Sequence, residues 1–130
     1  MKQAVVDREN FVNDERLRKE ERLLKRPQFV ETRRRGKRAA GRSVVVYARP
    51  TSLGHPRLGL TVSRKVGNAV VRNRWKRRLR DIFRRSKTDI GSLDVVIIVK
   101  GGRRLPDYDR LSSDVLKTID RAARVARRSE

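Results

Sequence analysis

The sequence predicts a single domain of the α+β class, with elements in the order α-β-β-β-α-β-α. The chain has 130 residues, the usual size of one domain. Residues Ala69–Arg85 repeat apolar side chains at helical spacing, whereas Leu93–Lys100 is an almost unbroken apolar run, which is typical of a strand covered on both faces. These observations set the class, and local signals predict the remaining elements.

The N-terminal part divides into an extension and a first helix. Met1–Glu20 is dense in charges of both signs and holds few apolar anchors, so we expect a mobile extension before a folded domain, residues 21–130. Pro27 suits a first helical turn and Gly36 suits the position after a helix end, which predicts a short basic helix over Pro27–Arg35.

Three strands are predicted before the long helix. Ser43–Arg49 is rich in β-branched residues and is closed by Pro50, and Lys37–Ala40 is predicted as a short strand before it. Arg57–Lys65 alternates apolar residues with small or polar ones, the period of a strand. Thr51–Pro56, between them, has the composition of a loop.

Capping signals place the two later helices. Asn68 is a good N-cap for the long helix. After the apolar strand and a loop, Ser112 or Ser113 is predicted to cap a last helix that ends near Arg127 and turns its apolar residues inward.

The long helix carries an apolar stripe on an otherwise cationic surface. The stripe comprises Val71, Trp75, Leu79, Ile82 and Phe83, and its spacing places Trp75 in the core. Only Asp81 offsets the cations, which are Arg72, Arg74, Lys76, Arg77, Arg78, Arg80, Arg84 and Arg85. Because like charges on one helix repel, a polyanion such as nucleic acid is the expected partner.

Composition narrows the classes of partner. The formal net charge of +21 favours nucleic acid, and aromatic residues at 5% of the chain disfavour binding to a membrane surface. No apolar run is long enough to span a bilayer, and the N-terminus lacks the apolar core of a signal peptide, so we expect a cytoplasmic protein. The absence of cysteine excludes disulfides and cysteine-based zinc sites.

The sequence offers no convincing catalytic constellation of its own. A protein nuclease needs metal-binding carboxylates or a histidine acid–base pair, yet the one histidine, His55, lies in a Gly-Pro loop. Carboxylates in and before the last helix are interpreted as capping groups and a solvated face: Asp107, Asp109, Asp114 and Asp120. Any reacting groups are therefore expected to come from a partner.

One segment resembles a known family. Arg64–Arg78 reads RKVGNAVVRNRWKRR, which closely resembles the signature of the bacterial ribonuclease P protein component family, and Arg80–Arg84 supplies the tail of that signature. The resemblance covers about Glu21 to Arg127. It implies a mixed four-stranded sheet with helices packed on it, in which the strand–helix–strand unit around the basic helix crosses over with the rare left hand.

The resemblance also implies a function and a set of sites. Proteins of this family bind a catalytic RNA that uses Mg²⁺ to cut the 5′ leader from precursor tRNA, and they hold that leader. By position, the contacts to the catalytic RNA fall on Arg72, Asn73, Arg74, Lys76, Arg77 and Arg80. The leader contacts fall on Phe29, Arg33, Tyr47, Ser63, Arg64, Lys65, Asn68 and Lys100.

Several interpretations stay open at this stage. The RNA is expected to bind most of the magnesium, and the Asn73 amide either fixes the helix locally or helps to hold a metal bridged to phosphate. Phe29 either anchors the first helix or stacks on a base, and Arg33 stands where the family often has a second aromatic residue. The alternative function is a structural RNA-binding protein of ribosomal type. No membrane contact and no obligate protein partner is expected.

Overall fold

The computed structural model describes residues 17–23 and 25–129, so most of the predicted extension lies outside the described residues. A 3₁₀ turn, η1, spans Lys19–Glu21. The helices are α1 (Arg26–Arg35), α2 (Ala69–Arg85), α3 (Lys87–Ile90) and α4 (Tyr108–Arg128). The strands are β1 (Lys37–Ala40), β2 (Val44–Pro50), β3 (Arg57–Thr61) and β4 (Leu93–Val99).

The strands form one mixed sheet in the order β1-β2-β4-β3. β2 pairs antiparallel with both β1 and β4, whereas β3 and β4 are parallel neighbours joined through α2. This arrangement confirms the predicted α+β class and mixed four-stranded sheet. The hand of the crossover stays a prediction.

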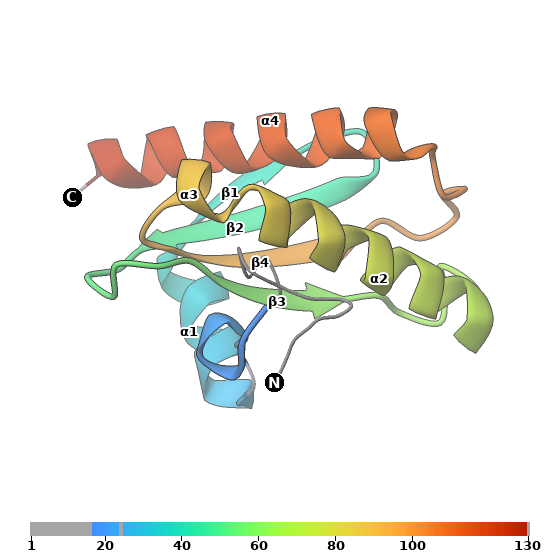
Figure 1. Ribbon diagram of the computed structural model, residues 1–130, viewed down its shortest axis with the longest axis horizontal. Coiled ribbons are helices and arrows are strands. Elements are labelled where there is room, and N and C mark those ends of the chain that lie inside the picture. The colour runs from blue at the N-terminus through green and yellow to red at the C-terminus, as the bar shows by residue number, and fades with distance from the viewer. Residues whose placement is uncertain (1–16, 24, 130) are drawn as a thin grey trace, which may run out of the picture.

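The helices cover the two faces of the sheet unequally. α2, α3 and α4 lie on one side and α1 lies on the other (Figure 1). Alternate residues of the central strands, such as Val46 and Ile97, point into the core with α2 and α4. Trp75 is fully buried in this core, as its place on the apolar stripe predicted.

α1 ends where predicted, but for a different reason. Gly36 follows the helix with φ −76°, which any residue can adopt, so a left-handed cap is not what requires glycine. A Cβ atom on Gly36 would clash with the Thr32 carbonyl oxygen and would lie 2.8 Å from that of Ala48. The close approach of α1 to β2 therefore excludes a side chain here.

The start of α4 differs from the prediction. Asp107, not Ser112 or Ser113, is the N-cap, and its Oδ1 accepts from the backbone N–H of Arg110 at 2.9 Å. Aspartate and serine both cap well, so composition cannot choose between successive turns. Packing makes that choice, because Leu111 in the first turns of the helix is fully buried.

Three further differences concern short segments. β3 stops at Thr61 instead of Lys65, because the chain turns so that the Val66 N–H donates to the Ser63 carbonyl at 3.0 Å. α3 and η1 were not predicted. Leu17, assigned by sequence to the extension, is buried in the core cluster, so the fold includes it.

Asp114 also departs from its predicted place on a solvated face. Its two carboxylate oxygens accept the backbone N–H groups of Arg42 and Ser43, each at 2.8 Å. These residues form the turn between β1 and β2, so the carboxylate fastens that turn to α4. Neither backbone donor has a partner within the hairpin at this point, which explains the need for a side-chain acceptor.

Candidate nucleic-acid interface

α2 displays its cations because its opposite side is anchored. The Oδ1 atom of Asn68 accepts from the Val71 N–H at 3.0 Å, which confirms the predicted N-cap. Trp75, Leu79 and Phe83 are fully buried beneath the helix. With this stripe fixed, the intervening basic side chains are directed outward.

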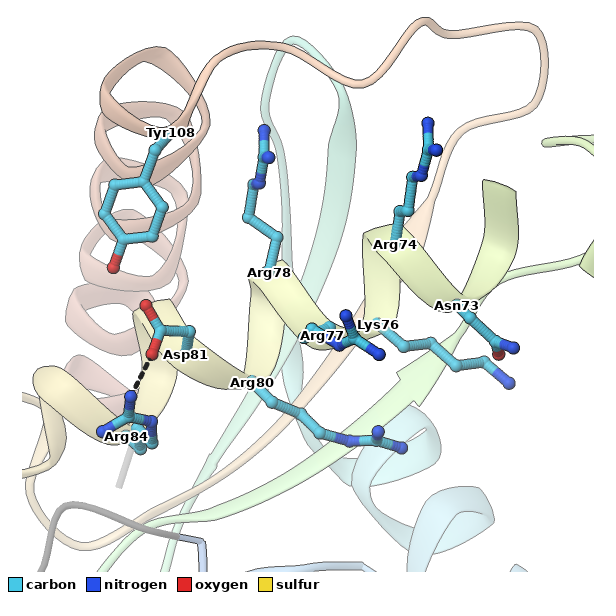
Figure 2. Close-up of a pocket in the computed structure, with 9 residues that line it drawn as sticks. All are labelled: Asn73, Arg74, Lys76, Arg77, Arg78, Arg80, Asp81, Arg84 and Tyr108. Atoms are coloured by element: carbon cyan, nitrogen blue, oxygen red, sulfur yellow. Dashed lines mark hydrogen bonds and ion pairs between the residues drawn. The ribbon is translucent and has the colours of Figure 1, made fainter. Parts of the chain in front are cut away.

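Five of the six residues predicted to contact the catalytic RNA line one surface hollow along α2 (Figure 2): Asn73, Arg74, Lys76, Arg77 and Arg80. Arg72 is not among the lining residues. It is half-buried, and its Nε atom is buried without a hydrogen-bond partner in the described part of the chain. The structure therefore separates Arg72 from the other five.

Four more residues complete the hollow: Arg78, Asp81, Arg84 and Tyr108. Asp81 pairs with Arg84 and, at 3.2 Å, with Arg85. Burial, followed by a hydrogen bond to Asp81, raises the pKa of the Tyr108 hydroxyl above its usual value. Tyr108 was not predicted, because its place follows from the true start of α4, whose N-cap Asp107 precedes the predicted caps Ser112 and Ser113.

On the opposite face of the sheet, three of the predicted leader contacts lie together. Tyr47 and Gly59 are both in register with Val96 and so form one row across β2, β4 and β3. The Phe29 ring covers Gly59, where a Cβ atom would lie 2.6 Å from Cζ of the ring. The Arg33 guanidinium lies over the Tyr47 ring, 5.4 Å from its centroid.

The other predicted leader contacts gather at one edge of the sheet, because parallel β3 and β4 end on the same side. Ser63, Arg64, Lys65 and Asn68 follow β3, and Lys100 follows β4. The Lys65 carbonyl accepts the Gly102 N–H at 3.3 Å, which joins the two connections. The Lys100 ammonium donates to the Gly41 carbonyl at 2.7 Å and keeps further donors for a ligand.

Between these two groups runs a row of three residues in register on the same face: Val45, Ile98 and Thr61. Val45 and Ile98 are half-buried and Thr61 is exposed. The row offers a partly apolar strip with aromatic rings at one margin and cations at the other. Phe29 is itself half-buried, so its contact with Gly59 anchors α1 and leaves part of the ring accessible.

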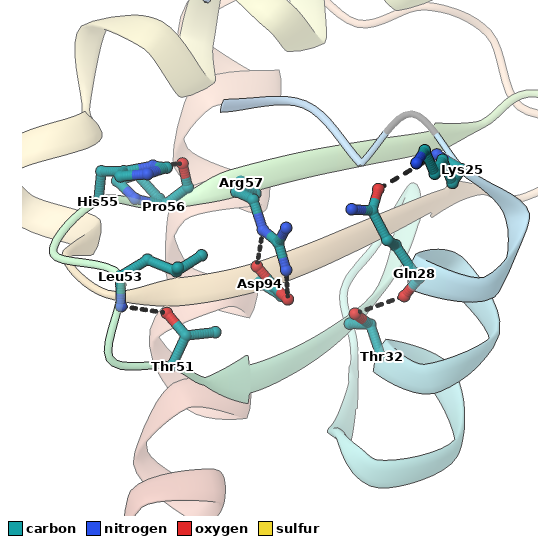
Figure 3. Close-up of polar contacts among 9 residues, drawn as sticks. All are labelled: Lys25, Gln28, Thr32, Thr51, Leu53, His55, Pro56, Arg57 and Asp94. Atoms are coloured by element: carbon teal, nitrogen blue, oxygen red, sulfur yellow. Dashed lines mark hydrogen bonds and ion pairs between the residues drawn. The ribbon is translucent and has the colours of Figure 1, made fainter. Parts of the chain in front are cut away.

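A buried ion pair that was not predicted from the sequence lies on the α1 face of the sheet. Asp94 is 1% exposed and accepts from Nε and Nη2 of Arg57 at 2.7 and 2.6 Å (Figure 3). The hydrogen bond and the nearby charge of Asp94 raise the pKa of Arg57 despite its partial burial. The two residues are partners in the β3–β4 register, so only the strand pairing shows that they meet.

Two findings bear on metals and membranes. Within residues 17–23 and 25–129, no three His, Cys, Asp or Glu side chains are grouped so that they could hold a metal ion. In the same part of the chain, no helix is both long and apolar enough to cross a membrane. The Asn73 side chain is exposed and lines the hollow on α2.

Comparisons with known proteins agree with this architecture. A family model described as Ribonuclease P matches residues 17–123. The ribonuclease P protein component of Citrifermentans bemidjiense is 38% identical over 103 residues, 79% of this chain and 89% of the relative. That of Syntrophus aciditrophicus is 43% identical over 93 residues, 71% of this chain and 78% of the relative.

Solved structures give the same result. A Staphylococcus aureus RNase P protein mutant with defective mRNA degradation activity superposes with a TM-score of 0.74 at 30% identity, over 81% of this chain and 90% of the mutant. The RNase P protein from Thermotoga maritima superposes with a TM-score of 0.68 at 31% identity, over 78% of this chain and 96% of that protein. The chain belongs to the family of bacterial ribonuclease P protein components.

Proposed function

We propose that the hollow on α2 binds the backbone of the ribonuclease P RNA and that the α1 face of the sheet binds the 5′ leader of precursor tRNA. As a member of its family, the chain is the protein subunit of the ribonucleoprotein endoribonuclease that matures the 5′ end of tRNA. The observation that carries the residue assignment is the convergence of Asn73, Arg74, Lys76, Arg77 and Arg80 on one hollow.

The chemistry of the hollow suits phosphate. Arg74, Arg77 and Arg80 are exposed, and each guanidinium offers paired N–H donors to a phosphate oxygen pair. Asp81, the one carboxylate in the lining, is already paired with arginines of its own helix. The hollow therefore keeps an excess of positive charge for a polyanion, and its contacts carry little sequence preference.

The α1 face suits an unpaired strand. Tyr47 and Phe29 present aromatic rings beside the half-buried row through Ile98, and bases of any identity stack on such rings. Arg33 lies over the Tyr47 ring, so a guanidinium takes the place of a second aromatic surface. Arg64 and Lys65 at the edge of the sheet are exposed and available to leader phosphates.

The RNA would supply the catalytic centre, and magnesium ions bound there would supply the Lewis-acid chemistry of the cut. The protein residues position RNA and leader around that centre. The exposed amide of Asn73 is the one protein group proposed to reach a magnesium ion bridged to phosphate. We place this assembly in the cytoplasm, with its tRNA substrate.

Neutralising the hollow tests the proposal. Arg74→Ala with Arg77→Ala should weaken binding to the catalytic RNA and reduce the slope of log K against log salt by about one per residue. The same variant should stimulate cleavage of precursor tRNA at low magnesium less than the wild type does. An unchanged salt slope would contradict phosphate contact. RNA binding by the wild type without stimulated cleavage would instead favour the structural RNA-binding alternative.

A further inference from the structure

A second basic hollow lies beyond the connection from β4 to α4. We call it the α4 patch and define it by its five cations: Arg42, Arg103, Arg104, Arg110 and Lys117. They come from the β1–β2 turn, the β4–α4 connection and the first half of α4. None of them belongs to the signature segment or to the leader set described above.

Rigid contacts hold this patch together. The Asp114 carboxylate binds the N–H groups of Arg42 and Ser43 at 2.8 Å, which fixes the turn against α4. The N-cap Asp107 fixes the start of the helix directly after the connection. The cations are therefore brought together by folded backbone rather than by chance proximity of long side chains.

The patch keeps an excess of positive charge. All five cations are exposed. Arg110 lies 3.6 Å from the Asp107 carboxylate, whereas Arg42, Arg103, Arg104 and Lys117 make no side-chain hydrogen bond or ion pair to another described residue. Two carboxylates line the patch. Asp114 already accepts two backbone N–H groups, so Asp109 is the one lining carboxylate that could offset these cations.

The two hollows meet at one strip of chain. Arg78, which lines the hollow on α2, donates from Nη1 to the carbonyl of Pro106 at 2.8 Å, and Pro106 lines the α4 patch. In Figure 2, Arg74 and Arg78 point to the side of α2 where this connection passes, whereas Lys76 and Arg80 point to the other side. A backbone bound along α2 thus has a basic route across the connection to α4.

We propose that the α4 patch binds a second segment of backbone of the same catalytic RNA. The inference rests on the proposed function of α2 and extends its footprint to another surface. Exposed guanidinium groups without carboxylate partners, in a hollow whose described lining residues are all polar or charged except Pro106, match a polyanion better than a protein interface. The connection held by Arg78 keeps both sites at a fixed spacing, which favours one extended ligand.

The test compares two pairs of arginines that change the net charge equally. Arg103→Ala with Arg104→Ala should weaken binding to the catalytic RNA by about tenfold at moderate salt and should lower the salt slope by about one to two. The control, Arg124→Ala with Arg128→Ala, removes two exposed arginines from the far end of α4 and should leave the slope unchanged. Thermal unfolding checks that both variants stay folded.

Each outcome decides between the two claims. Suppose that the Arg103/Arg104 variant binds the catalytic RNA with the same salt slope as its control, while the Arg74/Arg77 variant has a reduced slope. The α4 patch is then only a solvated surface, and the proposed function stands. If the Arg74/Arg77 variant also keeps its slope, the proposed function fails, and the inference fails with it. A loss seen only when precursor tRNA is present would assign the patch to the substrate and overturn the inference.

Discussion

The two faces of the sheet are built from the same strands, but they differ in how deeply their side chains are buried and in the role that we assign to them. On the face covered by α2 and α4, Val46 and Ile97 are fully buried in an apolar core. On the α1 face, their neighbours Tyr47 and Ile98 stay half-buried, although they lie on the same two strands. Because side chains alternate along a strand, substitutions one residue apart should separate stability from binding.

The largest effect is expected on the core face. Trp75→Ala should lower the free energy of unfolding by roughly 3–5 kcal/mol, because it opens a cavity under α2. Trp75→Phe should cost much less, since it keeps a ring and removes the indole N–H, which is buried without a hydrogen-bond partner among the described residues. Denaturant unfolding of both variants checks this. Equal losses for the two variants would contradict a packing role.

The ion pair on the α1 face comes next. Asp94→Ala should lower the free energy of unfolding by about 3 kcal/mol, since it leaves a charged guanidinium over the sheet. This loss is at the low end of the range that is typical when a buried ion pair is broken, because the Arg57 side chain is 22% exposed. Adding Arg57→Met should recover part of the loss, as both charges are then gone. If the double variant loses as much unfolding free energy as Asp94→Ala and Arg57→Met lose together as single variants, the two side chains are not coupled.

Binding, not stability, should change at Tyr47. Tyr47→Ala should weaken the complex with leader-bearing tRNA by roughly 1–3 kcal/mol, the usual value of one base stacked on an aromatic ring. Affinity for mature tRNA should stay the same, and Tyr47→Phe should retain most of the leader preference. The comparison is made by titrating both tRNAs into the assembled ribonucleoprotein. Equal losses for both tRNAs would remove Tyr47 from the leader site.

The smallest effect concerns alkaline pH. Burial raises the pKa of Tyr108 in the folded protein, so the unfolded chain loses this proton first as the pH rises. The protonated Tyr108 therefore makes its full contribution to stability at pH values below the ordinary tyrosine pKa. That contribution is lost as the pH rises through the pKa of Tyr108 in the folded protein. Tyr108→Phe should remove this part of the alkaline decline. The check is unfolding at a series of pH values near and above 10. An identical decline in wild type and variant would exclude Tyr108.

Sequence patterns predicted the elements that carry strong local signals. α2 has both a clear apolar stripe and an Asn68 cap, so its bounds were correct, and the apolar run of β4 was located almost to the residue. Helical spacing predicted a cationic surface outside the apolar stripe, whereas the residues expected to contact RNA came from the family resemblance.

What escaped prediction depends on contacts between distant segments. The Arg57–Asp94 pair requires the register of two strands, and the Asp114 clamp requires α4 to lie across the β1–β2 turn. Tyr108 required the correct first turn of α4, which packing at Leu111 selects. Four-residue α3 is too short to show a period of its own.

The position of β4 between β2 and β3 has a consequence for biosynthesis. β3 leaves the ribosome before its sheet partner exists, since within the described residues its only strand neighbour is β4, made after α2. A growing chain therefore exposes its cationic helix before the platform for that helix is complete. The proposed RNA-binding surface on α2 is therefore completed only late in translation, when β4 pairs with β2 and β3.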